Sequence, residues 1–308
     1  MVLGYFGPVV AIHFPYDTGY VELEPLDQGV DARSYYEQVY TKPTGGSDES
    51  DHDYVSLGRQ AGAGTVVQVQ EFVERYGLEK ARTLEVGAGS GQLQDVVADY
   101  TGLDIAASAA TYFHKPFVQG SALDLPFEDN EFDSIWTVFT LEHVPDPEKA
   151  LEEMRRVGKR DAMLFLYPAW NCASWTAYGY EVRPYESLSW TEKIAKASLR
   201  IRAEPLFRFS YLAPTRLLRY ASFRVWRQPQ RLRYTALRPN YTNYWLPDAD
   251  AVASFDTVEA ILWFSSRGDE CLNCPADLTE LMFLPFGPIH IRLTGKQAGD
   301  STPTVRGS

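Results

Sequence analysis

Apolar positions in the middle of the chain follow two alternating periods. Residues 65–76 place apolar side chains at helical spacing before Gly77, which predicts an amphipathic helix. A similar stripe within residues 146–157 predicts a second helix. Short apolar runs predict strands at residues 83–86, 100–105, 133–139 and 162–167. Strands that alternate with helices are typical of a parallel, doubly wound α/β sheet.

Regular periodicity stops after the last of these strands and returns near the C-terminus. Residues 170–250 are rich in aromatic residues, arginine and proline. Asp256 can then cap a helix, with Glu259 placed to complete a capping box and Gly268 placed for the left-handed residue that follows a helix. The alternative is a strand in this region, but both end signals favour a helix. Residues 289–293 predict a final strand.

The length of 308 residues suits one large domain that carries a sizeable insertion. A short helix is expected near residues 34–40, and the Gly, Ser and acidic content of residues 44–53 is typical of a solvated loop. The expected parts are a leader or lid at 1–53, a core at 54–168 and 256–295, an inserted cap at 169–255 and a flexible tail at 296–308.

The composition is that of an ordinary globular protein, with 45% hydrophobic and 23% charged residues. No apolar run approaches the roughly 20 residues that cross a bilayer. The apolar start of the chain lacks the charged n-region of a signal peptide. Three cysteines, Cys172, Cys271 and Cys274, predict no disulfide framework, and their odd number fits a reducing compartment. We therefore expect a cytoplasmic protein.

Charge is unevenly distributed along the chain. The net charge is −12, but residues 190–240 hold ten Arg and two Lys against Glu192 and Glu204. This stretch therefore carries +10, and the rest of the chain carries −22. A basic, aromatic cap suits an anionic or amphiphilic acceptor, peripheral contact with a membrane, or stacked bases. The sequence pI of 4.9 argues against a nucleic-acid partner.

One helix is expected within this basic stretch, at residues 215–228. Four apolar side chains would lie on one side of it and three arginines elsewhere: Leu217, Leu218, Ala221 and Val225, against Arg216, Arg219 and Arg227. An alternative is a helical subdomain with solvated arginines whose stems cover apolar surface.

The strongest chemical signal is the run Gly87-Ala88-Gly89-Ser90-Gly91, directly after a predicted strand. Glycines let a backbone turn sharply and approach a ligand closely. Residues 92–98 can begin a helix, whose N-terminus would present free N–H groups. The segment therefore predicts a site for a nucleoside-containing ligand.

This G-x-G-x-G run, with Glu85 two residues before it, resembles motif I of class I S-adenosylmethionine-dependent methyltransferases and not the G-x-G-x-x-G dinucleotide fingerprint. The resemblance continues through the GSALDLPF sequence at 120–127 and the LEH sequence at 141–143. It implies a Rossmann-like, mostly parallel sheet whose last strand is antiparallel, interrupted by a helical, aromatic and Arg-rich cap. Ser121 departs from the acid usual in this family, and Asp104 follows Gly91 so closely that the first helix must be brief.

The resemblance also implies a role for each motif residue. S-adenosylmethionine is the implied cofactor, with Glu85 orienting its methionine end and Asp104, next to Ile105, holding its ribose. His143 is the candidate catalytic base, and the alternative is that it only hydrogen-bonds the cofactor loop. The other cofactor-binding residues are expected to be Gly87, Ala88, Gly89, Ser90, Gly91, Ser121, Ala122, Leu123 and Thr140.

The cysteine pair Cys271 and Cys274 invites a zinc hypothesis, but a structural zinc site needs four ligands and there is no second pair. We therefore expect no metal. The predicted function is transfer of a methyl group, by in-line displacement, to a small or amphiphilic acceptor that is anionic or lipid-linked. Two alternatives remain: a non-catalytic cofactor-binding protein that holds a partner or membrane through its basic cap, and an RNA methyltransferase.

Overall fold

The computed structural model describes residues 32–41, 54–181, 183–226, 228–241, 248–275 and 277–295. Most of the leader predicted at 1–53, including the whole loop predicted at 44–53, lies outside the described residues, as do the tail predicted at 296–308 and Arg227. Among those described, no helix is both long and apolar enough to span a membrane.

A seven-stranded sheet organises the fold, with strand order β3-β2-β1-β4-β5-β9-β8. The first five strands run parallel, and β9 is antiparallel to both β5 and β8. The predicted mostly parallel sheet with an antiparallel last strand is therefore confirmed. The strands are β1 Thr83–Val86, β2 Tyr100–Asp104, β3 Phe117–Gln119, β4 Phe132–Val138, β5 Gly158–Tyr167, β8 Glu270–Cys271 and β9 Ile289–Arg292.

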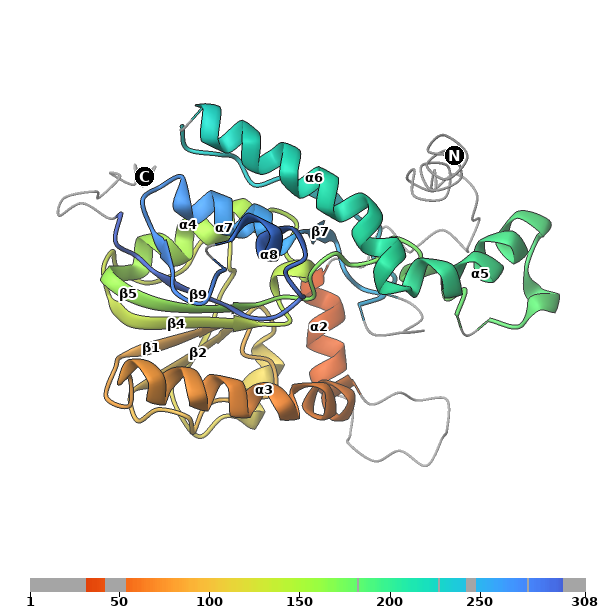
Figure 1. The fold of residues 1–308 in the computed structure, drawn as a ribbon. Helices are drawn as coiled ribbons and strands as arrows, with labels where there is room; N and C mark the ends of the chain where they lie inside the picture. Colours follow the sequence, from red (N-terminus) through yellow and green to blue (C-terminus); the bar gives the residue numbers. More distant parts are fainter. Residues whose placement is uncertain are drawn as a thin grey trace, which may run out of the picture.

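Helices cover both faces of this sheet (Figure 1). The helices are α2 Ala32–Thr41, α3 Tyr54–Tyr76, α4 Pro147–Val157, α5 Trp190–Ala203, α6 Pro205–Trp226, α7 Thr257–Ser265 and α8 Leu278–Met282. Short 3₁₀ turns are η2 Ala107–Tyr112, η3 Leu141–His143, η4 Thr176–Tyr178 and η5 Tyr185–Ser187. A separate antiparallel pair joins β6 Tyr234–Ala236 to β7 Ala253–Phe255.

The buried core lies on both sides of β4 and β5 because successive side chains of a strand point to opposite faces. Ile135 and Leu164 pack with residues of α4 and α7 in one apolar cluster. Trp136 and Phe165 pack with Phe72 of α3 in the other. Burial on both faces explains why these strands are almost wholly apolar in sequence.

The helix expected at residues 92–98 is absent, and this prediction is wrong. The chain forms turns there, with N–H groups of Gln94 and Val96 donating to carbonyls only three residues earlier. Leu93 and Val97 are buried, so the short segment returns directly to β2 while filling the core. By contrast, α3 begins eleven residues before the predicted start at residue 65.

The predicted capping of α7 is half right. Asp256 is the N-cap, and its carboxylate accepts from the N–H of Val258 at 2.9 Å. Glu259 does not complete a capping box, because both of its carboxylate oxygens accept from Nε of Arg219 at 2.9 Å. Gly268 adopts the expected left-handed backbone, with φ of 81°.

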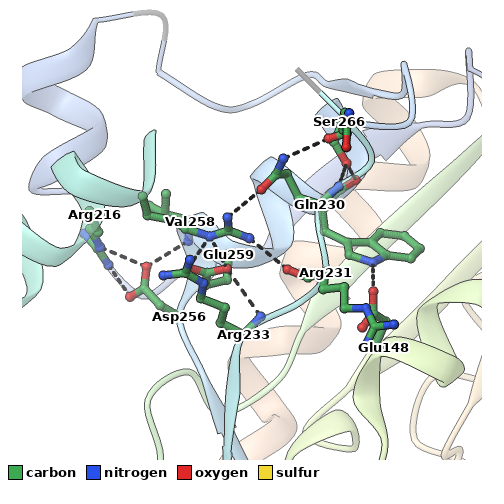
Figure 2. A network of polar contacts seen from close by, with 12 residues as sticks. Glu148, Arg216, Gln230, Arg231, Arg233, Asp256, Val258, Glu259 and Ser266 are labelled. Carbon is green, nitrogen blue, oxygen red and sulfur yellow. Dashed lines mark hydrogen bonds and ion pairs between the residues drawn. The ribbon is translucent and has the colours of Figure 1, made fainter. Parts of the chain in front are cut away.

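The orientation of α6 contradicts the alternative in which its arginines are solvated and its apolar residues are covered. Arg216 and Arg219 are buried against α7, whereas Leu217, Leu218 and Val225 are exposed. Figure 2 shows Arg216 directed at Asp256, with bonds of 2.9 and 2.8 Å from Nε and Nη2. The arginines therefore face the core because they bind the carboxylates of Asp256 and Glu259, and the apolar stripe on the other side of the helix faces solvent.

The cysteines also differ from the sequence expectation. A disulfide joins Cys271 to Cys274, whose Cα atoms are 5.5 Å apart. The chain leaves the strand at Cys271, so the two residues do not lie on one straight strand where they would face opposite sides. Cys172 is a free, partly buried thiol.

Candidate active site

Two adjoining cavities lie beside the carboxyl ends of β1, β2 and β4, the edge where open α/β sheets bind ligands. The larger has a volume of about 520 Å³ and the smaller about 200 Å³. Tyr40, Gly87, Phe139 and His143 line both of them. A ligand that passes Gly87 and His143 could therefore occupy both cavities.

The glycine-rich loop lines the larger cavity, and its Gly87 lines both cavities. Its glycines take left-handed backbone conformations that other residues rarely adopt. Gly87 has φ of 74°, and a Cβ there would lie 2.1 Å from Thr140. The N–H groups of Gly87 and Ala88 both donate to the carbonyl of Leu103, at 2.8 and 2.9 Å. The Thr140 hydroxyl donates to the carbonyl of Val138 at 2.9 Å and lies 3.3 Å from that of Gly87. Thr140 therefore braces the loop and lines only the smaller cavity.

Asp104 holds the same loop from the end of β2. Its Oδ2 accepts from the N–H of Gly89 at 2.9 Å, and its Oδ1 accepts from the N–H of Ala106 at 3.0 Å. Burial raises the pKa of Asp104, although these N–H groups act in the opposite direction. Each carboxylate oxygen has a second lone pair that can accept a further hydrogen bond. Asp104 lines the smaller cavity, as does the neighbouring Ile105.

The three residues expected around adenine, Ser121, Ala122 and Leu123, also line the smaller cavity. Ser121 accepts a hydrogen bond from the N–H of Leu123 at 3.2 Å, which closes a tight local turn. The serine that replaces the usual acid of this motif therefore has a local structural partner.

Glu85 lies at the end of the larger cavity. The hydroxyl of Tyr100 donates to its Oε2, and burial raises the pKa of Glu85 to about 8. Ala88 and Ser90 line the same cavity, and Arg59 of α3 donates to the side chain and carbonyl of Ser90 at 3.2 and 3.3 Å.

Gly91 lines neither cavity. Its φ is 67°, and a Cβ would lie 3.1 Å from the ring of Phe113. Its N–H donates to the carbonyl of Ala88 at 2.9 Å. The structure therefore gives Gly91 a place in the turn and in packing, away from the cavity surface expected from the sequence.

His143 lies among carboxylates at the junction of the cavities. Its Nδ1 is 3.6 Å from Oδ2 of Asp250, and its Nε2 is 3.8 Å from Oε1 of Glu142. Burial opposes a charge on the imidazole, but Asp250, Glu142 and Asp248 outweigh it, so the pKa of His143 is raised. A proton on this side chain is therefore held more firmly than on an exposed histidine.

Glu142 is fully buried, and neither of its carboxylate oxygens has a hydrogen-bond partner among the described residues. Burial raises the pKa of Glu142 to about 7. Glu142, His143 and Asp248 each place a ligand atom within 4.8 Å of the others. They are the candidate metal ligands of the described chain, and cysteine spacing could not have indicated them.

Two tyrosines that line the cavities, Tyr36 and Tyr40, were not predicted from the sequence. Tyr36 and Tyr40 lie one turn apart on α2, and their spacing by four residues is the signal that could have placed them together. The Tyr36 hydroxyl donates to Asp250 at 2.8 Å. The Tyr40 hydroxyl lies 3.0 Å from the position of a Cβ on Gly89. Burial raises the pKa of Tyr40 well above its usual value.

Comparison with known protein families identifies one match within the core. Residues 84–166 match the family model described as "Methyltransferase domain". This range holds the glycine-rich loop, the end of β2 and the residues around His143.

Two curated relatives are similar to parts of the chain. The demethylmenaquinone methyltransferase of Renibacterium salmoninarum is 40% identical over 88 residues, which cover 25% of this chain and 37% of the relative. The fatty-acid O-methyltransferase of Mycolicibacterium smegmatis is 29% identical over 195 residues, which cover 54% of this chain and 66% of the relative. The chain thus spans less than two thirds of the length of either relative.

A solved structure, that of the YcgJ protein from Bacillus subtilis, is 16% identical with a TM-score of 0.39. The superposition covers 75% of this chain and 94% of that protein.

Proposed function

We propose that the protein transfers a methyl group from S-adenosylmethionine to a small or amphiphilic acceptor, a proposal supported by the match of residues 84–166 to a methyltransferase domain. The observation that carries the proposal is the pair of adjoining cavities that meet at Gly87 and His143. One cavity suits the nucleoside of the cofactor, and the other leaves room for an acceptor.

The residues present fit this cofactor. Asp104 would offer buried carboxylate lone pairs to the ribose hydroxyls, and the apolar side chains of Ile105 and Leu123, which line the smaller cavity, would contact the adenine. A Cβ at Gly87 would collide with the Thr140 side chain, so only glycine lets the loop pack this closely where it lines both cavities. Glu85 and Ser90 line the side of the larger cavity that the methionine end would enter.

When bound, S-adenosylmethionine supplies a methyl group that its sulfonium already activates. The contribution of the chain is then alignment, which can account for roughly 7 to 11 kcal/mol of a reaction barrier. His143 lines both cavities and is placed to accept the proton of a hydroxyl acceptor when its imidazole is neutral, with the Asp250 carboxylate 3.6 Å from its Nδ1.

The proposed acceptor is amphiphilic. The larger cavity combines apolar residues, including Val55, Leu93 and Val138, with the acids Asp248 and Asp250 at one end. The two relatives described above are named for a quinone precursor and a fatty acid, both of them amphiphiles. This similarity supports an acceptor with an apolar body and a polar methylated end.

Calorimetric titration of the protein first tests whether it binds the proposed cofactor. S-adenosylmethionine and S-adenosylhomocysteine should bind with micromolar affinity, whereas NAD should not bind. Asp104→Ala should weaken the binding of S-adenosylmethionine by about 1.5 to 3 kcal/mol, the usual contribution of a hydrogen bond to a charged group. Asp95→Ala, at an exposed acid paired with His114, is the matched control and should change nothing.

Transfer of a radiolabelled methyl group to demethylmenaquinol and to long-chain fatty acids tests the activity. Labelled product, with release of S-adenosylhomocysteine, is the expected result. Tight cofactor binding without product from any amphiphilic acceptor would favour a non-catalytic cofactor-binding protein. Failure to bind either S-adenosyl compound would contradict the proposal as a whole.

A further inference from the structure

Helix α5 presents an apolar stripe to solvent. Trp190, Ile194, Ala197 and Ile201 are exposed, and their spacing places them on one side of the helix. Trp190 is 80% exposed. The opposite side, with Ala195 and Leu199, is buried against Tyr178, Tyr180 and Leu188. The helix is therefore packed on one face and apolar on the other.

Helix α6 continues this pattern. Leu206, Leu217, Leu218, Ala221 and Val225 are exposed and share one side of the helix, and Leu206 is 87% exposed. We call the exposed apolar residues of α5 and α6 the apolar face. Large exposed apolar side chains gathered on one side of a helix indicate an interaction site in a soluble protein.

Buried ion pairs hold α6 in this orientation. Arg216 binds Asp256 on the side of α6 that faces α7 (Figure 2). Arg219 binds Glu259 of α7 in the same way. Arg216 also donates to the carbonyl of Met282 at 3.0 Å. Rotation of α6 to bury its leucines would expose these pairs and leave buried carboxylates without partners. The outward apolar face is therefore part of the folded structure.

The exposed charge of α5 and α6 themselves is mostly positive. Between residues 190 and 226, five cations are exposed or half-buried, and Glu204 is the one exposed acid of this described stretch. Lys193 and Arg200 lie on one flank of the α5 stripe, and Arg224 lies beside the stripe of α6. The molecule as a whole carries −12, so a basic region on it selects strongly for an anionic partner.

We propose that the apolar face docks on an anionic lipid surface, with its apolar side chains in the headgroup and acyl boundary and its cations on the lipid phosphates. Amphipathic helices with Trp and Leu on one side and Lys or Arg at the flanks bind membranes in this way. A second copy of the chain fits less well, because it would bring two positive faces together.

Flotation with lipid vesicles tests the proposal on the full chain. Vesicles of phosphatidylglycerol and phosphatidylcholine should bind the protein and shift its tryptophan emission to shorter wavelength, whereas pure phosphatidylcholine should bind it at least tenfold more weakly. No methyl donor is present, so this result is independent of the proposed activity.

Two variants separate the apolar and electrostatic contributions. Trp190→Ser with Ile194→Ser and Leu218→Ser should abolish flotation. Lys193→Gln with Arg200→Gln and Arg224→Gln should weaken it by about fivefold for each cation removed, and added salt should have the same effect. All six side chains are exposed or half-buried, so circular dichroism should remain unchanged.

Val67→Ser is the matched control, because Val67 is an exposed apolar residue of α3 outside this face. It should leave vesicle binding unchanged. Equal binding to neutral and anionic vesicles, or equal loss in the control, would overturn the proposal. So would a dimer in sedimentation equilibrium that the Trp190→Ser triple variant dissociates, because a second copy would then cover the face.

Discussion

The hydroxyl of Tyr36 donates a 2.8 Å hydrogen bond to the carboxylate of Asp250, and 214 residues separate the two in sequence. The bond joins α2 to the segment that precedes β7, directly beside His143. Asp250 lies 3.6 Å from Nδ1 of His143. The proton affinity of the histidine therefore depends on residues from three distant parts of the chain.

Asp250→Asn should lower the pKa of His143, because it removes the strongest of the carboxylates that favour the charged imidazole. Glu142 and Asp248 remain and retain part of the effect. An NMR titration of the His143 ring protons, assigned with His143→Gln, measures the change. Tyr36→Phe leaves the carboxylate in place and should change the pKa less, and an equal change in both variants would assign the effect to the hydroxyl.

Gly89→Ala should destabilise the fold by about 1 to 2 kcal/mol, because φ of 50° is left-handed and an added Cβ would contact the Tyr40 hydroxyl at 3.0 Å. Cofactor affinity should fall as well. Gly64→Ala is the matched control, since nothing lies within 4 Å of a Cβ on this helical glycine. It should stabilise by about 0.5 to 1 kcal/mol in urea denaturation. A neutral effect of Gly89→Ala would show that the loop can relax.

Glu85 should make the protein less stable as the pH rises. Burial raises its pKa from 4.5 to about 8, so between these values the folded state keeps a proton that the unfolded chain releases. Stability then falls with pH across this window. The raised pKa of His143 acts in the same direction, with stability that is present at low pH and lost as the pH rises.

Thermal denaturation of the ligand-free protein at about pH 5 and about pH 8 measures this dependence. Glu85→Gln should flatten it, because the amide can still accept from Tyr100 and cannot ionise. Glu79→Gln, at an exposed glutamate, should behave like the unmodified protein. A dependence unchanged in Glu85→Gln would assign the pH response to other groups.

The ion pairs between α6 and α7 should be sensitive to the loss of one partner. Arg219→Met should destabilise by about 3 to 5 kcal/mol, because Glu259 would remain buried without its cation. Replacing both residues, as Arg219→Met with Glu259→Leu, should recover most of this loss. Glu270→Ala breaks an exposed pair with Arg292 and should cost less than about 1 kcal/mol in the same denaturation experiment.

The sequence by itself determined the position of the glycine-rich loop and most strands of the sheet, namely β1, β2, β4, β5 and β9, but it did not predict β3 or β8. These depend on local properties: the apolar period of strands such as β4 and β5, and the backbone freedom that Gly87 and Gly89 require. The motif also singled out Asp104 and Ser121, and both line the smaller cavity.

Only the tertiary structure decided how distant segments meet. Tyr36 reaches Asp250 across most of the chain, and no local pattern encodes that contact. The helical period of α6 predicted its apolar stripe correctly, but it did not predict which side of the helix faces the core. The arginines face the core because they pair there with Asp256 and Glu259, and the leucines are left exposed. The helix expected at residues 92–98 is replaced by turns because the return to β2 is short. Local sequence preferences are compatible with more than one arrangement of these features. Long-range packing and buried charge determine which arrangement forms.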